Sequence, residues 1–305
     1  MSANETLVTR CGFVALVGAP NAGKSTLVNA LVGAKVSIVS RKAQTTRALV
    51  RGIAIEGASQ IVLVDTPGVF TPKRRLDRAM VASALAGAKD ADLNLLIVDA
   101  RKGLDEEISA LMRQLVESKA PKWLVLNKVD LAPRESLLAL AKDFNEAQTF
   151  EETFMISALS GDGLDRLRAR LAPAMPVSPW LYPEDQLSDA PLRLLAAEIT
   201  REKLFERLHD ELPYESTVET SLWENRKDGS ARVEQTIYVA REGQKKIAIG
   251  EGGRTIKAIG QAAREEISEA ADQKVHLFLF VKVRENWAED PERYREMGLE
   301  FPKGK

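Results

Sequence analysis

The sequence predicts two domains: a larger α/β domain with a mostly parallel sheet, followed by a smaller α+β domain. Its 305 residues suffice for about two domains of ordinary size. In the first half, short runs rich in β-branched residues alternate with longer stretches of helical apolar spacing, the pattern of parallel strands that are buried on both faces. The last third reads instead in the order α-β-β-α-α-β, so the architecture changes along the chain.

The strands expected in the first domain are residues 13–18, 50–56, 60–65, 93–100, 122–127 and 153–157. Pro176, Pro179 and Pro183 then resist both helix and central strand, so we place the interdomain linker there. The last third begins with helical spacing over 190–212 and ends with a strand, KVHLFLFVKV. The predicted division is 1–175 for the first domain, 176–189 for the linker, 190–285 for the second domain and 286–305 for a C-terminal tail.

Composition restricts the classes of function. The net charge is −1 and charged residues make up 29% of the chain, so any nucleic-acid surface must be a local patch. Cys11 is the single cysteine and cannot form an internal disulfide. The apolar runs fall far below the ~18 residues needed to span a bilayer, and the N-terminus lacks the apolar segment of a signal peptide. We therefore expect a cytoplasmic protein.

The stretch GAPNAGKS, Gly18 to Ser25, fits the phosphate-binding pattern G-x-x-x-x-G-K-S and lies between a predicted strand and a predicted helix. Its backbone N–H groups and the positive end of the following helix favour phosphate. Lys24 is expected to reach the β- and γ-phosphates, and the Ser25 hydroxyl to bind Mg²⁺. This loop alone does not distinguish ATP from GTP.

Three further motifs end predicted strands and point to guanine. DTPG, Asp65 to Gly68, offers a carboxylate for the Mg²⁺ shell and an N–H for the γ-phosphate. NKVD, Asn127 to Asp130, supplies a carboxylate that can accept hydrogen bonds from the N1–H and N2–H₂ edge of guanine, a donor pair that adenine lacks. SAL, Ser157 to Leu159, is expected to place a backbone N–H on guanine O6. Ligands of open α/β sheets bind at this carboxyl edge.

With four motifs in this order, residues 13–171 resemble the Ras-like P-loop GTPases. The expected fold is therefore a P-loop GTPase domain, the expected ligand is GTP or GDP, and the expected reaction is hydrolysis of GTP. The residues expected to contact the nucleotide are Gly18, Ala19, Pro20, Asn21, Ala22, Gly23, Lys24, Ser25, Thr26, Asp65, Thr66, Pro67, Gly68, Val69, Asn127, Lys128, Val129, Asp130, Ser157, Ala158 and Leu159.

The resemblance also implies a threonine on Mg²⁺ and the γ-phosphate, in the segment before the second strand. Thr45 and Thr46 both qualify, and we expect Thr46, because related bacterial GTPases keep a threonine directly before the arginine of this segment. The expected Mg²⁺ ligands are then Ser25, Thr46 and Asp65.

The residue after the DTPG glycine is Val69, where many Ras-like enzymes have a glutamine that orients the attacking water. An apolar side chain cannot polarise water, so we expect hydrolysis to be slow without activation. GTPases similar to this one often use K⁺ with the help of an asparagine in the phosphate loop, and Asn21 matches that asparagine. The residues expected to act in hydrolysis are Asn21, Lys24, Thr46 and Gly68.

A second glycine-rich stretch, KKIAIGEGGRTIKAIG, departs from both nucleotide fingerprints and contains G-x-x-G between two predicted helices. In an α-β-β-α-α-β order this is the arrangement of a type II KH domain, whose loop clamps about four single-stranded nucleotides. Arg241 to Lys257 contain five basic and two acidic residues, a local charge of +3. One of the acids, Glu251, lies inside the clamp and opposes phosphate. The residues expected to contact RNA are Arg241, Lys245, Lys246, Ile249, Gly250, Glu251, Gly252, Gly253, Arg254 and Lys257.

The two predicted domains together, the segment SRKAQTTR, and AAEITREKLFERLHDELPYESTVE followed by REGQKKIAIG resemble the bacterial Era family. The resemblance covers about residues 10–290. It implies a GTPase of small-subunit (30S) ribosome assembly that binds the 3′ region of the small-subunit rRNA, with peripheral association at the inner membrane. We expect a monomer in which the nucleotide reorders residues 36–50 and 65–80. The alternative is a GTP-dependent protein-docking module that regulates the cell cycle or a membrane, with a KH-like domain that binds protein.

Overall fold

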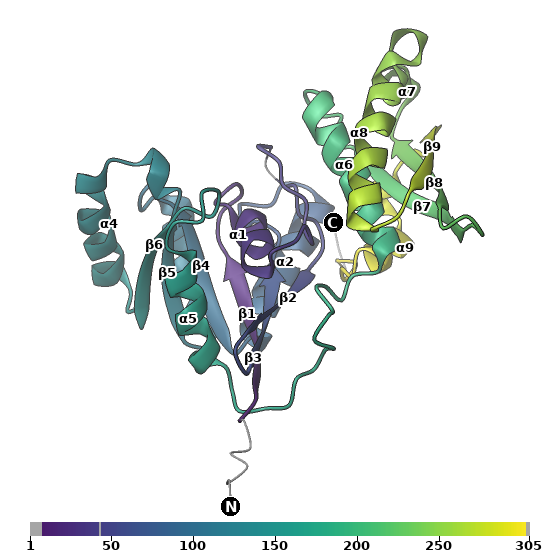
Figure 1. Cartoon of the computed structure of the whole chain (residues 1–305). Coiled ribbons are helices and arrows are strands. Elements are labelled where there is room, and N and C mark those ends of the chain that lie inside the picture. Colours follow the sequence, from purple (N-terminus) through teal and green to yellow (C-terminus); the bar gives the residue numbers. More distant parts are fainter. Residues whose placement is uncertain (1–7, 43, 303–305) are drawn as a thin grey trace, which may run out of the picture. The chain divides into compact units, whose positions relative to one another are not determined.

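The computed structural model describes residues 8–42 and 44–302 and divides the chain into two compact units (Figure 1). The first unit comprises Met1–Ser37 and Thr46–Asp189, and the second comprises Ile38–Thr45 and Ala190–Lys305.

The first unit is built on a six-stranded sheet in the order β2-β3-β1-β4-β5-β6. The strands are β1 (Arg10–Val17), β2 (Val50–Glu56), β3 (Ser59–Asp65), β4 (Leu93–Asp99), β5 (Lys122–Asn127) and β6 (Glu152–Ile156). Only β2, at the edge, runs antiparallel to its neighbour. Every residue of β3 and β4 is buried, because helices cover both faces of a sheet of this kind. The mostly parallel α/β sheet predicted from the sequence is confirmed.

Two helix layers cover this sheet. Helices α1 (Lys24–Val32) and α5 (Leu164–Ala174) pack on one face, where Leu27, Leu167 and Leu171 join the core. Helices α2 (Arg75–Asp90), α3 (Glu106–Leu115) and α4 (Arg134–Ala147) pack on the other. Because the parallel strands share one direction, the loops after β1, β4, β5 and β6 meet at one edge of the sheet, together with the loop after β3.

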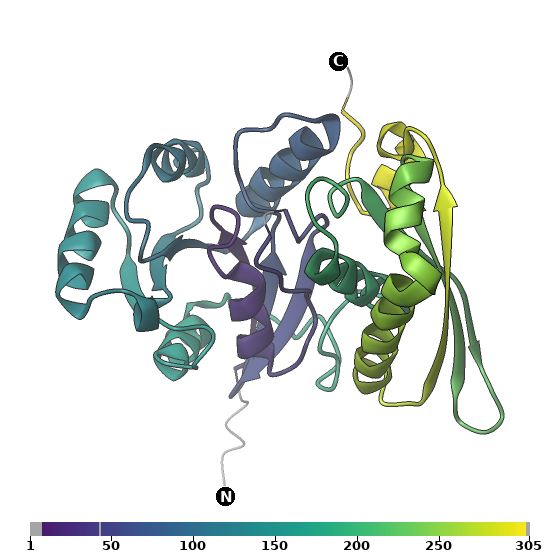
Figure 2. The same ribbon diagram turned by 90° about the horizontal axis from the view of Figure 1, so that it is seen from above.

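The second unit has a three-stranded sheet, β7-β8-β9, with the helices α6 (Leu192–Arg207), α7 (Glu242–Ile249) and α8 (Arg254–Ala270) on one face (Figure 2). Its other elements are β7 (Ser216–Asn225), β8 (Ala231–Val239), β9 (Val275–Val283) and α9 (Pro291–Glu296). Strand β8 pairs antiparallel with β7 and parallel with β9. The predicted α-β-β-α-α-β order of a type II KH domain is confirmed.

Two segments differ from the predicted division of the chain. The proline-rich residues 176–189 run along the first unit: the Cys11 N–H donates to the Pro176 carbonyl at 3.0 Å, and Arg51 pairs with Asp189 at 2.7 Å. Residues 38–45, predicted within the first domain, pack with the second unit. Ile38 is buried in the core beneath α6 and α8, because it is an apolar side chain next to an apolar cluster.

Among the described residues, no helix combines the length and the apolar character needed to cross a bilayer.

Candidate nucleotide site and candidate RNA-binding groove

The loop from Gly18 to Ser25 joins β1 to α1 and closes around the side chain of Lys24. Its ammonium is buried and donates to the carbonyl oxygens of Gly18 and Ala19, both at 3.0 Å. Burial lowers the Lys24 pKa to about 8, against the attraction of Asp65, which raises it. The site therefore holds a cation with little solvent around it, the condition under which phosphate oxygens bind most strongly.

The three side chains predicted to hold Mg²⁺ lie together. The Asp65 carboxylate ends β3, fully buried, and Oδ2 accepts from the Ser25 hydroxyl at 2.6 Å and lies 3.4 Å from the Thr46 hydroxyl. The Ser25 and Thr46 hydroxyls are 2.9 Å apart. Within the described part of the chain, Asp65 Oδ1 is buried and has no hydrogen-bond partner. Burial raises the Asp65 pKa, and the hydroxyl donors oppose that rise.

An orphaned carboxylate oxygen beside two hydroxyls is a set of hard oxygen donors, which suits Mg²⁺. A third hydroxyl, which no sequence motif indicated, belongs to Ser37 and donates to Asp65 Oδ2 at 2.6 Å. Asn29 Oδ1 positions it by accepting from the backbone N–H groups of Val36 and Ser37, both at 2.9 Å. The sequence offers one signal for this role, namely a serine in the segment between α1 and the pair Thr45-Thr46.

Thr45 and Thr46 have different partners. The Thr46 hydroxyl faces Ser25 and Asp65 in the first unit. The Thr45 hydroxyl donates to the Lys42 carbonyl at 2.8 Å, and its own carbonyl accepts from the Arg201 guanidinium of α6 in the second unit. Thr46 is thus the one of the two whose hydroxyl lies with the predicted Mg²⁺ ligands.

The DTPG loop passes close to the phosphate loop. A Cβ on Gly68 would lie 2.8 Å from the Pro20 backbone, so only glycine fits. The Thr66 hydroxyl donates to the Leu16 carbonyl at 2.7 Å, and the Val69 N–H donates to the Gly18 carbonyl at 3.1 Å. Val69 is buried, so the position that could orient a water is apolar and shielded.

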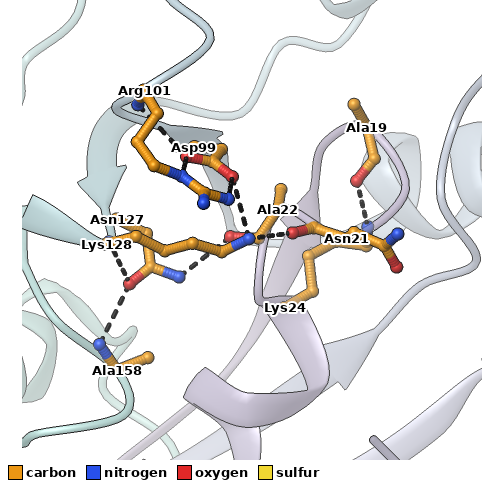
Figure 3. Close-up of polar contacts among 9 residues, drawn as sticks. All are labelled: Ala19, Asn21, Ala22, Lys24, Asp99, Arg101, Asn127, Lys128 and Ala158. Atoms are coloured by element: carbon orange, nitrogen blue, oxygen red, sulfur yellow. Dashed lines mark hydrogen bonds and ion pairs between the residues drawn. The ribbon is translucent and has the colours of Figure 1, made fainter. Parts of the chain in front are cut away.

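Asn127, at the end of β5, connects three of the predicted loops (Figure 3). Its amide Nδ2 donates to the Ala22 carbonyl of the phosphate loop at 2.9 Å. Its Oδ1 accepts from the backbone N–H of Lys128 at 2.8 Å and from that of Ala158 in the SAL motif at 3.0 Å. The side chain is buried, so these contacts fix the loops that would surround a guanine.

Asp99 and Arg101, which were not among the predicted site residues, join this network through the predicted Lys128 (Figure 3). The Lys128 ammonium donates to the Asn21 carbonyl and pairs with Asp99, at the end of β4, at 2.9 Å. The Arg101 guanidinium pairs with the same carboxylate at 2.6 Å. Burial opposes ionisation of Asp99, but hydrogen bonds from Arg101 and Lys128 outweigh it and hold the pKa of that carboxyl below its usual range. Asp130, the predicted guanine acceptor, lies exposed in the 3₁₀ turn Val129–Leu131.

The glycine loop of the second unit folds as a 3₁₀ turn, Glu251–Gly253, between α7 and α8. Gly250, Gly252 and Gly253 all have positive φ, and a Cβ on Gly250 would lie 2.2 Å from the Thr255 hydroxyl oxygen. The Glu251 carboxylate pairs with the Arg254 guanidinium, and both side chains are exposed. The acid that opposed the RNA prediction is therefore neutralised by the next basic residue.

A groove of about 400 Å³ lies beside this loop, between α8 and β9. Its residues are Ile256, Lys257, Gly260, Gln261, Arg264, Leu277 and Leu279. Of these, only Lys257 was among the predicted RNA contacts. Ile256, Gly260, Gln261 and Arg264 lie on the same helix, α8, and Leu277 and Leu279 form the opposite wall on β9. Arg241, Lys246 and Lys257 are exposed around the loop.

Comparison with known proteins decides the family. The model of the family described as 50S ribosome-binding GTPase matches residues 13–128, and that of the KH domain matches residues 211–288. The chain is 68% identical over 295 residues to GTPase Era of Afipia carboxidovorans, covering 97% of this chain and 96% of that protein. It is 66% identical to GTPase Era of Brucella suis, covering 98% and 96%.

The chain belongs to the Era family of GTPases.

Solved Era structures agree with this assignment. An Era variant from Aquifex aeolicus bound to GDP·AlF₄⁻ superposes with a TM-score of 0.90 at 37% identity, covering 95% of this chain and 99% of that one. An Era complex with MgGDPNP and nucleotides 1506–1542 of 16S ribosomal RNA gives the same values. The predicted family is therefore confirmed, and with it the fold of both Era domains.

Proposed function

We propose that this chain is a GTP-hydrolysing switch that binds single-stranded RNA, namely the 3′ region of the small-subunit rRNA, and acts in assembly of the 30S subunit. One observation carries the proposal: a chain of the Era family combines loops shaped for a guanine nucleotide with an open groove beside a G-x-x-G turn. Family members at this identity share the architecture on which the activity depends.

The guanine specificity rests on the loops that Asn127 joins. The side-chain amide of Asn127 is hydrogen-bonded to Ala22, Lys128 and Ala158. The exposed Asp130 carboxylate is therefore the group that would accept from the N1–H and N2–H₂ donors of guanine. Ser25, Thr46 and Asp65 would hold Mg²⁺, which the Era complex with MgGDPNP supports. The ion would neutralise charge on the β- and γ-phosphates. Lys24 would add a second positive charge at the same phosphates.

Hydrolysis is proposed to be slow without activation. Val69 is buried and apolar, and its N–H is already bonded to the Gly18 carbonyl. A positively charged group beside the phosphates would compensate, and K⁺ held with the help of Asn21 is our candidate. Asn21 is exposed and has a left-handed backbone with φ of 62°.

RNA binding is proposed at the glycine loop and its groove. Backbone N–H groups at the start of α8 favour phosphate, and the exposed cations Arg241, Lys246 and Lys257 add attraction. Leu277 and Leu279 give the groove an apolar wall for bases. The Era structure with nucleotides 1506–1542 of 16S rRNA supports the identity of the RNA.

The two functions are proposed to be coupled through the segment 38–45. Within the second unit, the Glu202 carboxylate of α6 accepts from the Val39 N–H at 2.6 Å, and Arg201 donates to the Thr45 carbonyl. The next residue, Thr46, belongs to the predicted Mg²⁺ site. A movement of Thr46 when GTP binds would therefore displace segment 38–45, which is packed against α6 of the second unit.

The test is the salt dependence of RNA binding. For single strands, the slope of log affinity against log salt is about −0.7 per neutralised phosphate. Lys246→Ala should lower that slope by about one such step. Lys142→Ala, which removes an exposed lysine of α4, is the matched control and should leave it unchanged. A flat slope in the wild type would favour the protein-docking alternative.

Cytoplasmic location, a monomeric state and peripheral association with the inner membrane complete the proposal. Sedimentation of the full chain with and without vesicles of anionic lipid checks the last two. A dimer, or no binding to the vesicles, would remove the corresponding part while leaving the nucleotide and RNA sites untouched.

A further inference from the structure

The face of the second sheet that points away from its helices carries two exposed aromatic rings. Along β9, Leu277 and Leu279 pack toward the core with α7 and α8, so the alternate residues Phe278 and Phe280 point to the opposite side. Phe278 is 43% exposed and Phe280 is 47% exposed. Two exposed phenylalanines on one face of a strand form an apolar patch, the kind of surface on which a partner can bind.

This pair lies near the middle of β9, where Phe278 and Phe280 are in register with Glu234 and Thr236 of β8. Towards one end of the face, Arg293 of the C-terminal segment pairs with Glu219 of β7 at 2.8 Å and lies over the Tyr238 ring of β8, 5.1 Å from its centroid. The chain's own C-terminal residues therefore cover Tyr238, whereas the described residues leave Phe278 and Phe280 open.

Basic and acidic side chains both lie beside the rings, and a guanidinium stacks on one of them. The β9 sequence VHLFLFVKV has no acidic residue, and its outward positions include His276 and Lys282 as well as the two rings. On β8, the Arg232 guanidinium lies 5.0 Å from the centroid of the Phe278 ring. Glu234, in register with Phe278, is paired with that same arginine, and Glu224 of β7 is in register with Arg232, so this part of the face binds by stacking more than by net charge. Aromatic rings with a stacked guanidinium and basic neighbours are the features that hold single-stranded bases and their phosphates.

The rings are also continuous with the proposed RNA groove. Leu277 and Leu279 line the groove, and Phe278 and Phe280 lie on the opposite side of the same strand. Strand β9 is at the edge of the three-stranded sheet. An RNA strand that leaves the groove over this edge needs to cross only the width of one strand to reach the rings. The rings are two residues apart, about 6.7 Å along the strand, so each can take a different base.

We propose that Phe278 and Phe280, with Arg232, form a second RNA-binding surface that stacks bases lying beyond the about four nucleotides held by the glycine-loop clamp. This rests on the proposed RNA-binding function and extends it to a longer site that wraps around β9. The surface binds bases by stacking, so it accepts any base, and it adds affinity only to RNAs that are long enough to reach the rings.

The experiment compares RNA length with aromatic content in the full-length chain. The probes are nucleotides 1506–1542 of 16S rRNA and fragments of that segment of about 5, 10 and 15 nucleotides that share one clamp-binding core. The variants are Phe278→Ala/Phe280→Ala, which removes the rings, and Phe278→Trp/Phe280→Trp, which keeps stacking. Leu138→Ala, an exposed apolar residue of α4, is the matched control.

Wild-type affinity should rise with length, and the double alanine variant should bind the long RNAs about 5- to 100-fold more weakly while binding the shortest one normally. The tryptophan variant should retain the gain, and its fluorescence should be quenched by long RNA only. Equal affinity of the alanine variant and wild type at every length overturns the inference and assigns the face to a protein partner. A loss that is equal at all lengths also overturns it. If the wild type fails to bind even the longest RNA, the proposed RNA-binding function is wrong, and this inference is wrong with it.

Discussion

The ammonium of Lys128 lies 2.9 Å from the carboxylate of Asp99, and this ion pair links the ends of two neighbouring strands to the phosphate loop. Asp99 and Asn127 are directly paired in the parallel register of β4 and β5, so the residue after Asn127 reaches Asp99 easily. The same ammonium donates to the Asn21 carbonyl. The guanine-recognition loop and the phosphate loop are therefore held together by a charged contact as well as by Asn127.

Replacing Asp99 by asparagine should weaken binding of both GDP and GTP. The substitution keeps the shape but removes the charge that holds Lys128, a contact with an expected value of about 1.5–3 kcal/mol, or roughly a tenfold or greater rise in Kd. Titration with a fluorescent guanine nucleotide measures it. Glu106→Gln, which breaks an exposed ion pair with Arg113 in the same domain, should have no effect. Wild-type affinity in Asp99→Asn would show that the pair is not needed.

Nucleotide binding should take up a proton above pH 8. The buried Lys24 has a pKa of about 8 in the free protein, against an ordinary value of 10.5. Phosphate oxygens favour the charged ammonium and raise that pKa, so between pH 8 and 10.5 the bound state carries more protons than the free state. The affinity for nucleotide should fall by up to tenfold per pH unit between pH 8 and 10.5. Below pH 8, Lys24 is charged in the free and the bound state, so its titration should not affect the affinity.

Calorimetry at pH 9 in two buffers of different ionisation enthalpy counts the protons. The Lys24→Arg variant is the control, because its guanidinium stays charged throughout this range. If wild type takes up no proton at pH 9, the lysine is already fully charged in the free site and the account of its burial is wrong.

Thr46→Ala should reduce GTP turnover at least about tenfold and raise the Mg²⁺ concentration needed for half-maximal rate. Its hydroxyl lies with Ser25 and Asp65, whereas the neighbouring Thr45 hydroxyl is bonded to the Lys42 carbonyl. Thr45→Ala is thus a control one residue away and should leave the Mg²⁺ curve where it is. The assignment of Thr46 is wrong if Thr45→Ala shifts the Mg²⁺ curve and Thr46→Ala does not.

GTP turnover should rise when Na⁺ is replaced by K⁺ at constant ionic strength, and Asn21→Ala should remove the difference. Val69 cannot orient water, so a monovalent cation beside the phosphates is the expected substitute. Asn145→Ala, on the exposed side of α4, should keep the K⁺ response. Equal rates in both salts would contradict the K⁺ proposal and leave the proposal of GTP binding unchanged.

Sequence reasoning found the site residues that follow strands and missed those that only packing brings near. The predicted loops were recognisable because their motifs end strands of a parallel sheet, whose carboxyl ends share one edge. Asp99 follows the same logic and was available from the strand LNLLIVDA, but it belongs to no short motif. Gln261, Arg264, Leu277 and Leu279 become a groove wall only when β9 packs against α8.

The placement of residues 38–45 was beyond the sequence. Because these residues directly precede Thr46, the sequence suggested a loop of the first domain. Whether Ile38 packs beneath its own sheet or in the core with α6 depends on the surface that is open to it, and local pattern carries no such information. Arg201 shows the same limit: an arginine in a helical pattern predicts a solvent-facing side chain, yet it is buried against the Thr45 carbonyl.

The central claim is that GTP gates RNA binding, and the most direct test is the Kd of the full-length chain for a single-stranded RNA from nucleotides 1506–1542 of 16S rRNA. The measurement compares saturating GDP with a non-hydrolysable GTP analogue, both with Mg²⁺, at one salt concentration. We expect at least about fivefold tighter binding with the GTP analogue, a coupling of about 1 kcal/mol. The same Kd in both nucleotide states would contradict it.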